Sequence, residues 1–168
     1  MELPKRKSIR LKDYDYSQNG AYFITICTHN HECLFSDIVG ATLCGRPNNP
    51  QILMEKWLLE LENKFENIKI EKYVIMPNHI HFILVIYNTT DDHTGSPLHK
   101  MIDWYKTMTT NEYIRGVKHK IFPPFDKHIW QRGYYEHIIR NEKSYNEIWN
   151  YIDNNILSWE QDKLYHAK

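Results

Sequence analysis

Stretches of hydrophobic and polar residues predict seven regular elements along the 168-residue chain. Runs rich in β-branched and aromatic residues predict strands at residues 21–28, 68–76, 79–87 and 129–139. Apolar residues recurring every three to four positions predict helices at residues 52–67, 98–114 and 144–155. Gly116 is expected to end the second helix, and Ser144 with Glu147 resembles a capping box that begins the third.

The order of these elements predicts one domain spanning residues 1–168. Only Pro77-Asn78 separates the two middle strands, so we expect them to be antiparallel neighbours. The polar segments 29–50 and 88–97 are expected to be loops. The order strand, helix, strand, strand, helix, strand, helix favours an α+β fold, an antiparallel sheet with helices packed on it, close to the ferredoxin-like arrangement.

Composition narrows the class of protein. Hydrophobic residues make up 42% of the chain, enough for a core, but no apolar run reaches the ~18 residues of a membrane span. The start of the chain has no apolar segment after its charges, so we expect a cytoplasmic protein.

Its three cysteines are expected to be reduced thiols. No glycine-rich phosphate motif is present, so no nucleotide cofactor is expected.

Charge is balanced overall but unevenly distributed. The net charge is zero, yet residues 100–140 contain eight basic and four acidic side chains. A basic N-terminal arm, at about residues 1–18, adds further lysines and arginines. This distribution is compatible with a basic face that binds nucleic acid, and equally with an ordinary solvated surface of mixed charge.

His79-Ile80-His81 is a candidate metal-binding motif. Because side chains alternate along a strand, both imidazoles project from one face about 6.6 Å apart and can converge on one ion. The motif alone also fits two ordinary polar strand positions. The apolar run that follows favours the metal-binding interpretation, since it predicts a buried strand, and polar rings on a buried strand need partners.

A second group of metal-ligating residue types lies upstream. Cys27, His29, His31 and Cys33 alternate with other residues, and on an extended strand they would spread over about 20 Å. One tetrahedral zinc ion does not collect ligands so far apart. We therefore do not expect a zinc site here.

The predicted last helix offers a tyrosine and an amide at the edge of its apolar stripe. Ile148 and Ile152 define the stripe, and Tyr151 and Asn155 lie one turn apart beside it. Tyr151 fits a core tyrosine whose hydroxyl reaches the rim as well as it fits a functional residue. The Asn155 amide, on an inner face, needs hydrogen bonds or an ion.

These motifs together resemble a known family. The segments YFITICTHNHECLF, YVIMPNHIHFILVI, WQRGYYEHIIRNEKSY and YIDNNILSW are similar to those of the REP-associated tyrosine transposases and, more broadly, the single-tyrosine HUH transposases of small insertion sequences. The resemblance runs from about Tyr22 to Trp159.

The resemblance implies a function and its residues. It makes His79 and His81 the metal pair, Tyr151 the nucleophile, and Asn155 the amide that completes the metal site. It implies Mg²⁺ or Mn²⁺ as cofactor, single-stranded DNA folded into a hairpin as substrate, and a homodimer in the bacterial cytoplasm. The expected activity is nicking and strand transfer, that is DNA transposition, through a 5′-phosphotyrosyl intermediate.

DNA contacts are expected mainly from the basic segment. Phosphate contacts are assigned to Lys100, Lys106, Arg115, Lys118, Lys120, Arg132 and Arg140. Base stacking is expected from aromatics among Trp104, Tyr105 and Tyr134. Two competing hypotheses are a domesticated DNA-binding protein without cleavage, which needs none of His79, His81 and Tyr151, and a metal-dependent hydrolase of small phosphoesters, which needs more carboxylates near the histidines.

Overall fold

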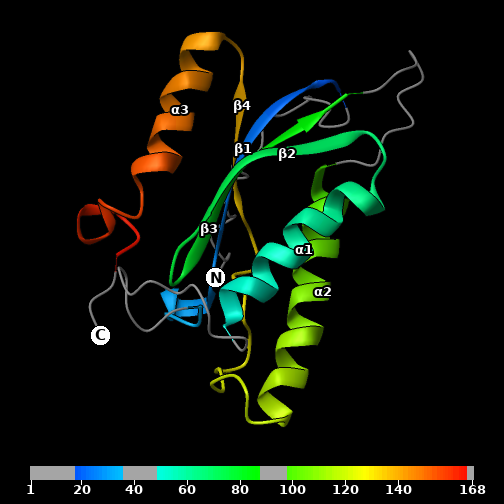
Figure 1. The fold of residues 1–168 in the computed structure, drawn as a ribbon, viewed down its shortest axis with the longest axis vertical. Coiled ribbons are helices and arrows are strands. Elements are labelled where there is room, and N and C mark those ends of the chain that lie inside the picture. The colour runs from blue at the N-terminus through cyan, green and yellow to red at the C-terminus, as the bar shows by residue number, and fades with distance from the viewer. Residues whose placement is uncertain (1–17, 36–48, 88–97, 166–168) are drawn as a thin grey trace, which may run out of the picture.

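Four strands form one antiparallel sheet in the order β2-β3-β1-β4 (Figure 1). The computed structural model describes residues 18–35, 49–87 and 98–165. The strands are β1 (Gly20–Cys27), β2 (Ile68–Ile75), β3 (His79–Ile86) and β4 (Tyr135–Ile139). The Met76 N–H donates to the His79 carbonyl at 2.9 Å and closes the tight turn between β2 and β3. This strand order is ferredoxin-like and confirms the predicted α+β fold.

Three helices cover the two faces of the sheet. Helices α1 (Pro50–Lys64) and α2 (Leu98–Lys118) pack on one face, and α3 (Glu142–Asn154) lies on the other (Figure 1). Two short 3₁₀ helices, η1 (His29–His31) and η2 (Trp159–Gln161), complete the elements of the described residues. No helix in these ranges is long and apolar enough to cross a membrane.

Strand β3 is buried on both faces, which explains its nearly continuous apolar sequence. Ile80, Phe82 and Leu84 pack into the core under α1 and α2. Ile83 faces the other way and belongs to a smaller cluster that includes Ile152 of α3. On this face of β3, His79, His81 and Ile83 are buried, and Val85 nearer the end of the strand is partly buried.

The helix starts differ from the predicted ones because asparagines cap them. Helix α1 begins at Pro50, and the Asn49 side chain accepts from the Gln51 N–H at 3.0 Å. Helix α3 begins at Glu142, and the Asn141 side chain accepts from the Ser144 N–H at 2.8 Å. The predicted capping box at Ser144 is therefore wrong. Asparagine is among the most favourable N-cap residues.

Helix α2 continues through Gly116 to Lys118, so the predicted stop at Gly116 is wrong. The Gly116 carbonyl accepts from the Ile121 N–H at 2.8 Å as the chain turns back over the helix end. A Cβ atom at Gly116 would lie 2.1 Å from the Phe122 ring. This glycine allows close packing rather than ending the helix.

Replacing Gly116 with alanine is expected to destabilise the protein. Alanine favours a helix by about 1 kcal/mol, but overpacking against a ring costs typically about 1–3 kcal/mol. We expect a net loss of about 1 kcal/mol in the free energy of unfolding, measured by urea denaturation. Gly20→Ala is the matched control, because its Cβ would make only ordinary contacts, at 3.7 Å or more. Equal or greater stability of Gly116→Ala would contradict this explanation.

Strand β4 is shorter than the predicted strand over residues 129–139. Trp130 pairs with Thr28 in an isolated bridge, and regular pairing resumes only at Tyr135 opposite Thr25. Five steps along one strand thus face three along β1, so the chain bulges between Trp130 and Tyr135, with the Gln131 N–H still donating to the Cys27 carbonyl of β1. The Lys106 ammonium donates hydrogen bonds to two carbonyls of this bulge, that of Gln131 at 3.0 Å and that of Gly133 at 2.8 Å.

Some expectations fall on residues outside the described ranges. These are the basic N-terminal arm up to residue 17, Cys44, and most of the two predicted loops, at residues 36–48 and 88–97. Cys27 and Cys33 carry free thiols, as expected.

Candidate metal and nucleophile site

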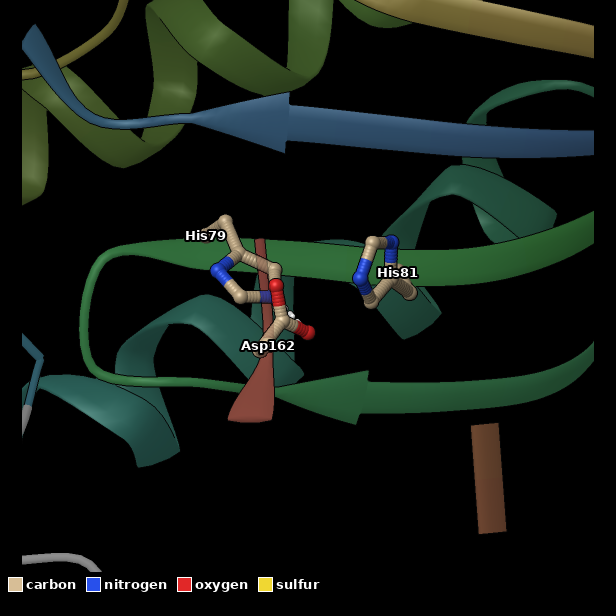
Figure 2. A group of neighbouring side chains, drawn as sticks. All are labelled: His79, His81 and Asp162. Atoms are coloured by element: carbon tan, nitrogen blue, oxygen red, sulfur yellow. Dashed lines mark ion pairs between the residues drawn. The ribbon is translucent and has the colours of Figure 1, made fainter. Parts of the chain in front are cut away.

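His79 and His81 lie side by side on the α3 face of β3 (Figure 2). Their ring centroids are 4.5 Å apart, and their exposed fractions are 0% and 3%. Ile80 between them points into the opposite core, as strand alternation predicts. Phe23 of β1 stacks on His81 with ring centroids 5.3 Å apart. The two imidazoles are therefore held in an enclosed position.

One nitrogen of each imidazole is engaged by a neighbouring side chain. Nδ1 of His79 lies 2.7 Å from Oδ1 of Asn78, and Nδ1 of His81 lies 2.7 Å from Oγ1 of Thr25. Asn78 is itself fully buried, and its Nδ2 donates to the Leu164 carbonyl at 2.8 Å. Partners of this kind orient the rings of metal-binding histidines and leave Nε2 as the ligand atom.

A carboxylate from the C-terminal segment reaches the histidine pair. Oδ2 of Asp162 lies 4.0 Å from Nε2 of His79 (Figure 2), and one ligand atom from each of Asp162, His79 and His81 lies within 4.8 Å of the other two. Oδ1 of Asp162 accepts from the Leu164 N–H at 2.7 Å, which fixes the carboxylate. Among the described residues this is the one group of three such ligands with the spacing of a metal site. Cys27, His29, His31 and Cys33 are not members of this group.

Sequence reasoning missed Asp162, Thr25 and the orienting role of Asn78. Asp162 follows η2 in a segment without helical or strand periodicity, eleven residues after Tyr151. No spacing rule connects such a residue with a strand motif. Its proximity to the histidines depends on the path of the chain after α3.

Helix α3 brings Tyr151 and Asn155 to the same place. The Tyr151 hydroxyl lies 3.2 Å from Nε2 of His81 and 3.4 Å from Oδ2 of Asp162. Asn155 caps the helix and is 3% exposed, with Nδ2 donating to Oδ2 of Asp162 at 3.1 Å. Both residues thus lie on the inner side of the helix, where the apolar stripe placed them.

Polar contacts between α3 and β2 set the position of Tyr151. Lys72 of β2 forms an ion pair with Asp153 and lies over the Trp149 ring, 4.7 Å from its centroid. The Tyr145 hydroxyl donates to Glu71. All of these residues belong to one chain, so a single copy brings the tyrosine to the histidines.

Burial keeps both histidines neutral at neutral pH. Burial lowers the pKa of His79 from 6.5 to about 4; the Asp162 carboxylate partly offsets this shift, and His31 adds to it. Burial, with a smaller contribution from His79, lowers the pKa of His81 well below its usual range. Neutral imidazoles have the free lone pair that metal binding requires.

The environment of Tyr151 opposes loss of its phenolic proton. Burial and then the Asp162 carboxylate raise the pKa of Tyr151 to about 12, although a hydrogen bond with Asn155 acts in the other direction. The phenol is therefore a weak nucleophile unless a nearby positive charge compensates.

The site opens into a cleft of about 880 Å³ between the sheet, α3 and the C-terminal segment. Tyr151 and Tyr135 line it, and their exposed fractions are 45% and 47%. This volume is within the range of sites for small organic ligands. The cleft therefore gives a substrate access to the Tyr151 hydroxyl.

The expected DNA contacts occupy different environments. Six of the seven basic residues are exposed: Lys100, Arg115, Lys118, Lys120, Arg132 and Arg140. The seventh, Lys106, holds the carbonyls before β4, and burial lowers its pKa to about 8. Tyr105 is fully buried, with its hydroxyl donating to the Met54 carbonyl at 3.1 Å, so within the group of three aromatics it is not available for stacking on bases.

Comparisons with known proteins identify the family. Residues 48–155 match the family described as "Transposase IS200 like". An uncharacterized protein of Haemophilus influenzae is 38% identical over 171 residues, which cover 95% of this chain and 93% of that protein.

Two solved structures share the fold. A REP-associated tyrosine transposase bound to a REP hairpin superposes with a TM-score of 0.59 at 21% identity, over 92% of this chain and 76% of that one. A putative transposase from Deinococcus radiodurans R1 superposes with a TM-score of 0.52 at 15% identity, over 86% and 97%. The family match over most of the chain, together with the 38% identity to the Haemophilus influenzae protein, shows that this protein belongs to the IS200-like transposase family.

Proposed function

We propose that this protein nicks single-stranded DNA and transfers the cut strand, with Tyr151 as the nucleophile. The observation that carries the proposal is the position of the Tyr151 hydroxyl, 3.2 Å from His81 and 3.4 Å from Asp162. A phenol beside a candidate metal site, in an open cleft of an IS200-like transposase, supports strand transfer over DNA binding alone.

A divalent cation, Mg²⁺ or Mn²⁺, fits the residues present. Nε2 of His79 and Oδ1 of Asn155 are buried and have no hydrogen-bond partner among the described residues. Buried polar atoms without partners cost free energy, and a cation would satisfy both. We propose His79, His81 and Asp162 as ligands, with the Asn155 amide oxygen as a fourth. Asp162 adds the carboxylate that Mg²⁺ and Mn²⁺ favour.

Tyr151 and the proposed metal site have different roles in the reaction. The Tyr151 hydroxyl gives up its proton as its oxygen attacks the scissile phosphorus, and the bond to the 3′ oxygen breaks. The 3′ oxygen takes up a proton, which leaves a 5′-phosphotyrosyl bond and a free 3′-hydroxyl. A bound cation would polarise the phosphate and stabilise its developing charge. Because the covalent bond keeps the energy of the phosphodiester, a 3′-hydroxyl can reverse the step and join DNA without a nucleotide cofactor.

We propose single-stranded DNA containing a hairpin as the substrate, because the REP-associated relative was solved with a REP hairpin. The six exposed basic residues named above, with Lys106, remain the candidates for phosphate contacts. A homodimer remains an expectation from the family resemblance.

The direct test is formation of a covalent protein–DNA adduct. The protein would be incubated with a labelled pool of hairpin oligonucleotides carrying randomised single-stranded flanks, with Mg²⁺ or Mn²⁺, and analysed on a denaturing gel. We expect a labelled band at the mass of protein plus DNA, absent when a chelator is added. No adduct with either metal, despite measurable binding of the pool, would favour a DNA-binding role without cleavage.

Two further variants test the proposed ligand set. Asp162→Asn keeps the shape of the side chain but removes its charge, and Asn155→Ala removes the buried amide. Because each loses a proposed ligand, we expect Mn²⁺ affinity to fall by at least the ~10–100-fold that removal of an outer partner causes, with a smaller change in DNA affinity, measured by calorimetry and fluorescence anisotropy. Glu160→Gln, an exposed neighbour of Asp162, is the control. Metal titrations equal to wild type would remove both residues from the site.

A further inference from the structure

A second cleft lies between α2 and the segment that leads to β4. It measures about 380 Å³, and we call it the α2 groove. Its polar lining comes from two sides: Thr107, Thr110 and Asn111 on α2, and Lys127, His128 and Arg132 on the opposite segment. No carboxylate lines it among the described residues, although Asp126 lies beside Lys127, with 3.9 Å between carboxylate and ammonium. The groove is therefore electropositive.

The α2 groove lies next to the cleft that contains Tyr151, here called the catalytic cleft, and the end of β1 separates the two. Gln131 lines the groove, and its N–H donates at 2.9 Å to the carbonyl of Cys27, which lines the catalytic cleft. Lys106 also lines the groove and holds the bulge between the two clefts through its carbonyls. At Gly133, on this bulge, no atom lies within 4 Å of where a Cβ would be. The two clefts therefore meet at this bulge, and the backbone at Gly133 is open to solvent on the side where a Cβ would lie.

The lining has the chemistry of a nucleotide site. Arg132 is exposed and can contact a phosphate. Asn111 is exposed on α2, and an asparagine amide offers the paired donor and acceptor that read a base edge. Phe125 and Trp130 supply apolar surface on the same side as Arg132. The volume is near the low end of the range of about 300–1,000 Å³ for small-ligand sites, which suits one unstacked nucleotide rather than a duplex stem.

We propose that the α2 groove binds a single-stranded nucleotide next to the cleavage point and so determines where the strand is cut. Asn111 reads the base and Arg132 holds the adjoining phosphate. The proposal rests on the proposed function, because it places the groove along the same DNA strand that Tyr151 attacks. It adds Asn111, on the opposite side of the sheet from α3, as a specificity-determining residue.

The first experiment locates the DNA directly. A single-stranded oligonucleotide selected from the adduct-forming pool would carry 4-thiothymidine at one position at a time, and the protein would be cross-linked by light and digested. We expect one or two positions beside the cleavage point to label peptides from residues 106–114 or 125–132. Labelling of other peptides from every position would overturn the proposal.

The second experiment tests the residues with matched variants. We expect Asn111→Ala and Arg132→Ala to weaken binding of the same oligonucleotide about tenfold, the typical effect of one lost base or phosphate contact, and Asn111→Ala to spread the cleavage positions. Lys64→Ala, an exposed charge at the end of α1, is the control. If both variants matched the wild type in oligonucleotide affinity and in cleavage positions, the proposal that the α2 groove binds a nucleotide would be refuted.

The two proposals fail in different ways. If the wild-type protein forms no adduct, the oligonucleotide would be taken from the pool by binding alone. Weaker oligonucleotide binding by the Asn111 variant, together with cross-links to groove peptides, would then support nucleotide binding in the α2 groove. The same result would leave cleavage by Tyr151 rejected. An adduct at wild-type level with unchanged binding by both variants would support the proposed function and reject the groove.

Discussion

Tyr151→Phe is expected to abolish the covalent protein–DNA adduct completely. The substitution deletes one oxygen and keeps the ring, which packs edge-on against Phe23 with centroids 6.0 Å apart. Without the hydroxyl no phosphotyrosyl bond can form. Loss of its hydrogen bonds should change the free energy of unfolding by only about 0.5–1.5 kcal/mol, so fold and DNA binding should persist. Denaturing gels, anisotropy and urea denaturation measure the three quantities.

Tyr135→Phe is the matched control for this prediction. Tyr135 lines the same cleft and is as exposed as Tyr151, but it lies on β4. Its variant should form the adduct at the wild-type level. Peptide mapping that found DNA on Tyr134, Tyr135 or Tyr145 would contradict the assignment of α3 to the catalytic site.

Replacing either histidine with asparagine is expected to remove metal binding and cleavage together. Both rings are buried, so alanine would leave a cavity that lowers the stability of the fold. A loss of activity could then not be assigned to the loss of a metal ligand. Asparagine keeps a donor near the Nδ1 position, toward Asn78 for His79 and Thr25 for His81, and lacks the Nε2 atom. We expect losses in Mn²⁺ affinity and adduct formation greater than the ~10–100-fold caused by removing an outer partner.

The exposed His119→Asn, at the end of α2, is the control for the histidine variants. It should match wild type in metal titration and in adduct yield. If His79→Asn and His81→Asn lost adduct formation while binding Mn²⁺ normally, the histidines would act on DNA directly and the metal assignment would fall. Circular dichroism verifies that each variant is folded.

Local periodicity was enough to predict the parts of the site that lie within one element. His79 and His81 share a face because side chains alternate along any strand, whatever the strand packs against. Tyr151 and Asn155 share a helix side because they are one turn apart. The tight turn at Pro77-Asn78 and the ferredoxin-like order follow likewise from neighbouring segments.

Element ends were predicted less well because contacts outside the element decide them. Phe122 packs on Gly116, so α2 passes through a residue that usually ends a helix. The Lys106 ammonium satisfies carbonyls that a longer β4 would have paired with β1. Neither contact leaves a pattern in the segment whose boundary it moves.

The assembled site required the tertiary structure. Tyr151 and His81 are 70 positions apart, and they meet because the apolar side of α3 is buried on the face of the sheet opposite α1 and α2. Asp162 and Thr25 reach the histidines from segments with no shared periodicity. The sequence by itself determined which residues each strand and helix presents on a common side, because that depends on backbone geometry. Which of those sides face one another depends on long-range burial of apolar surface, which is a property of the whole chain.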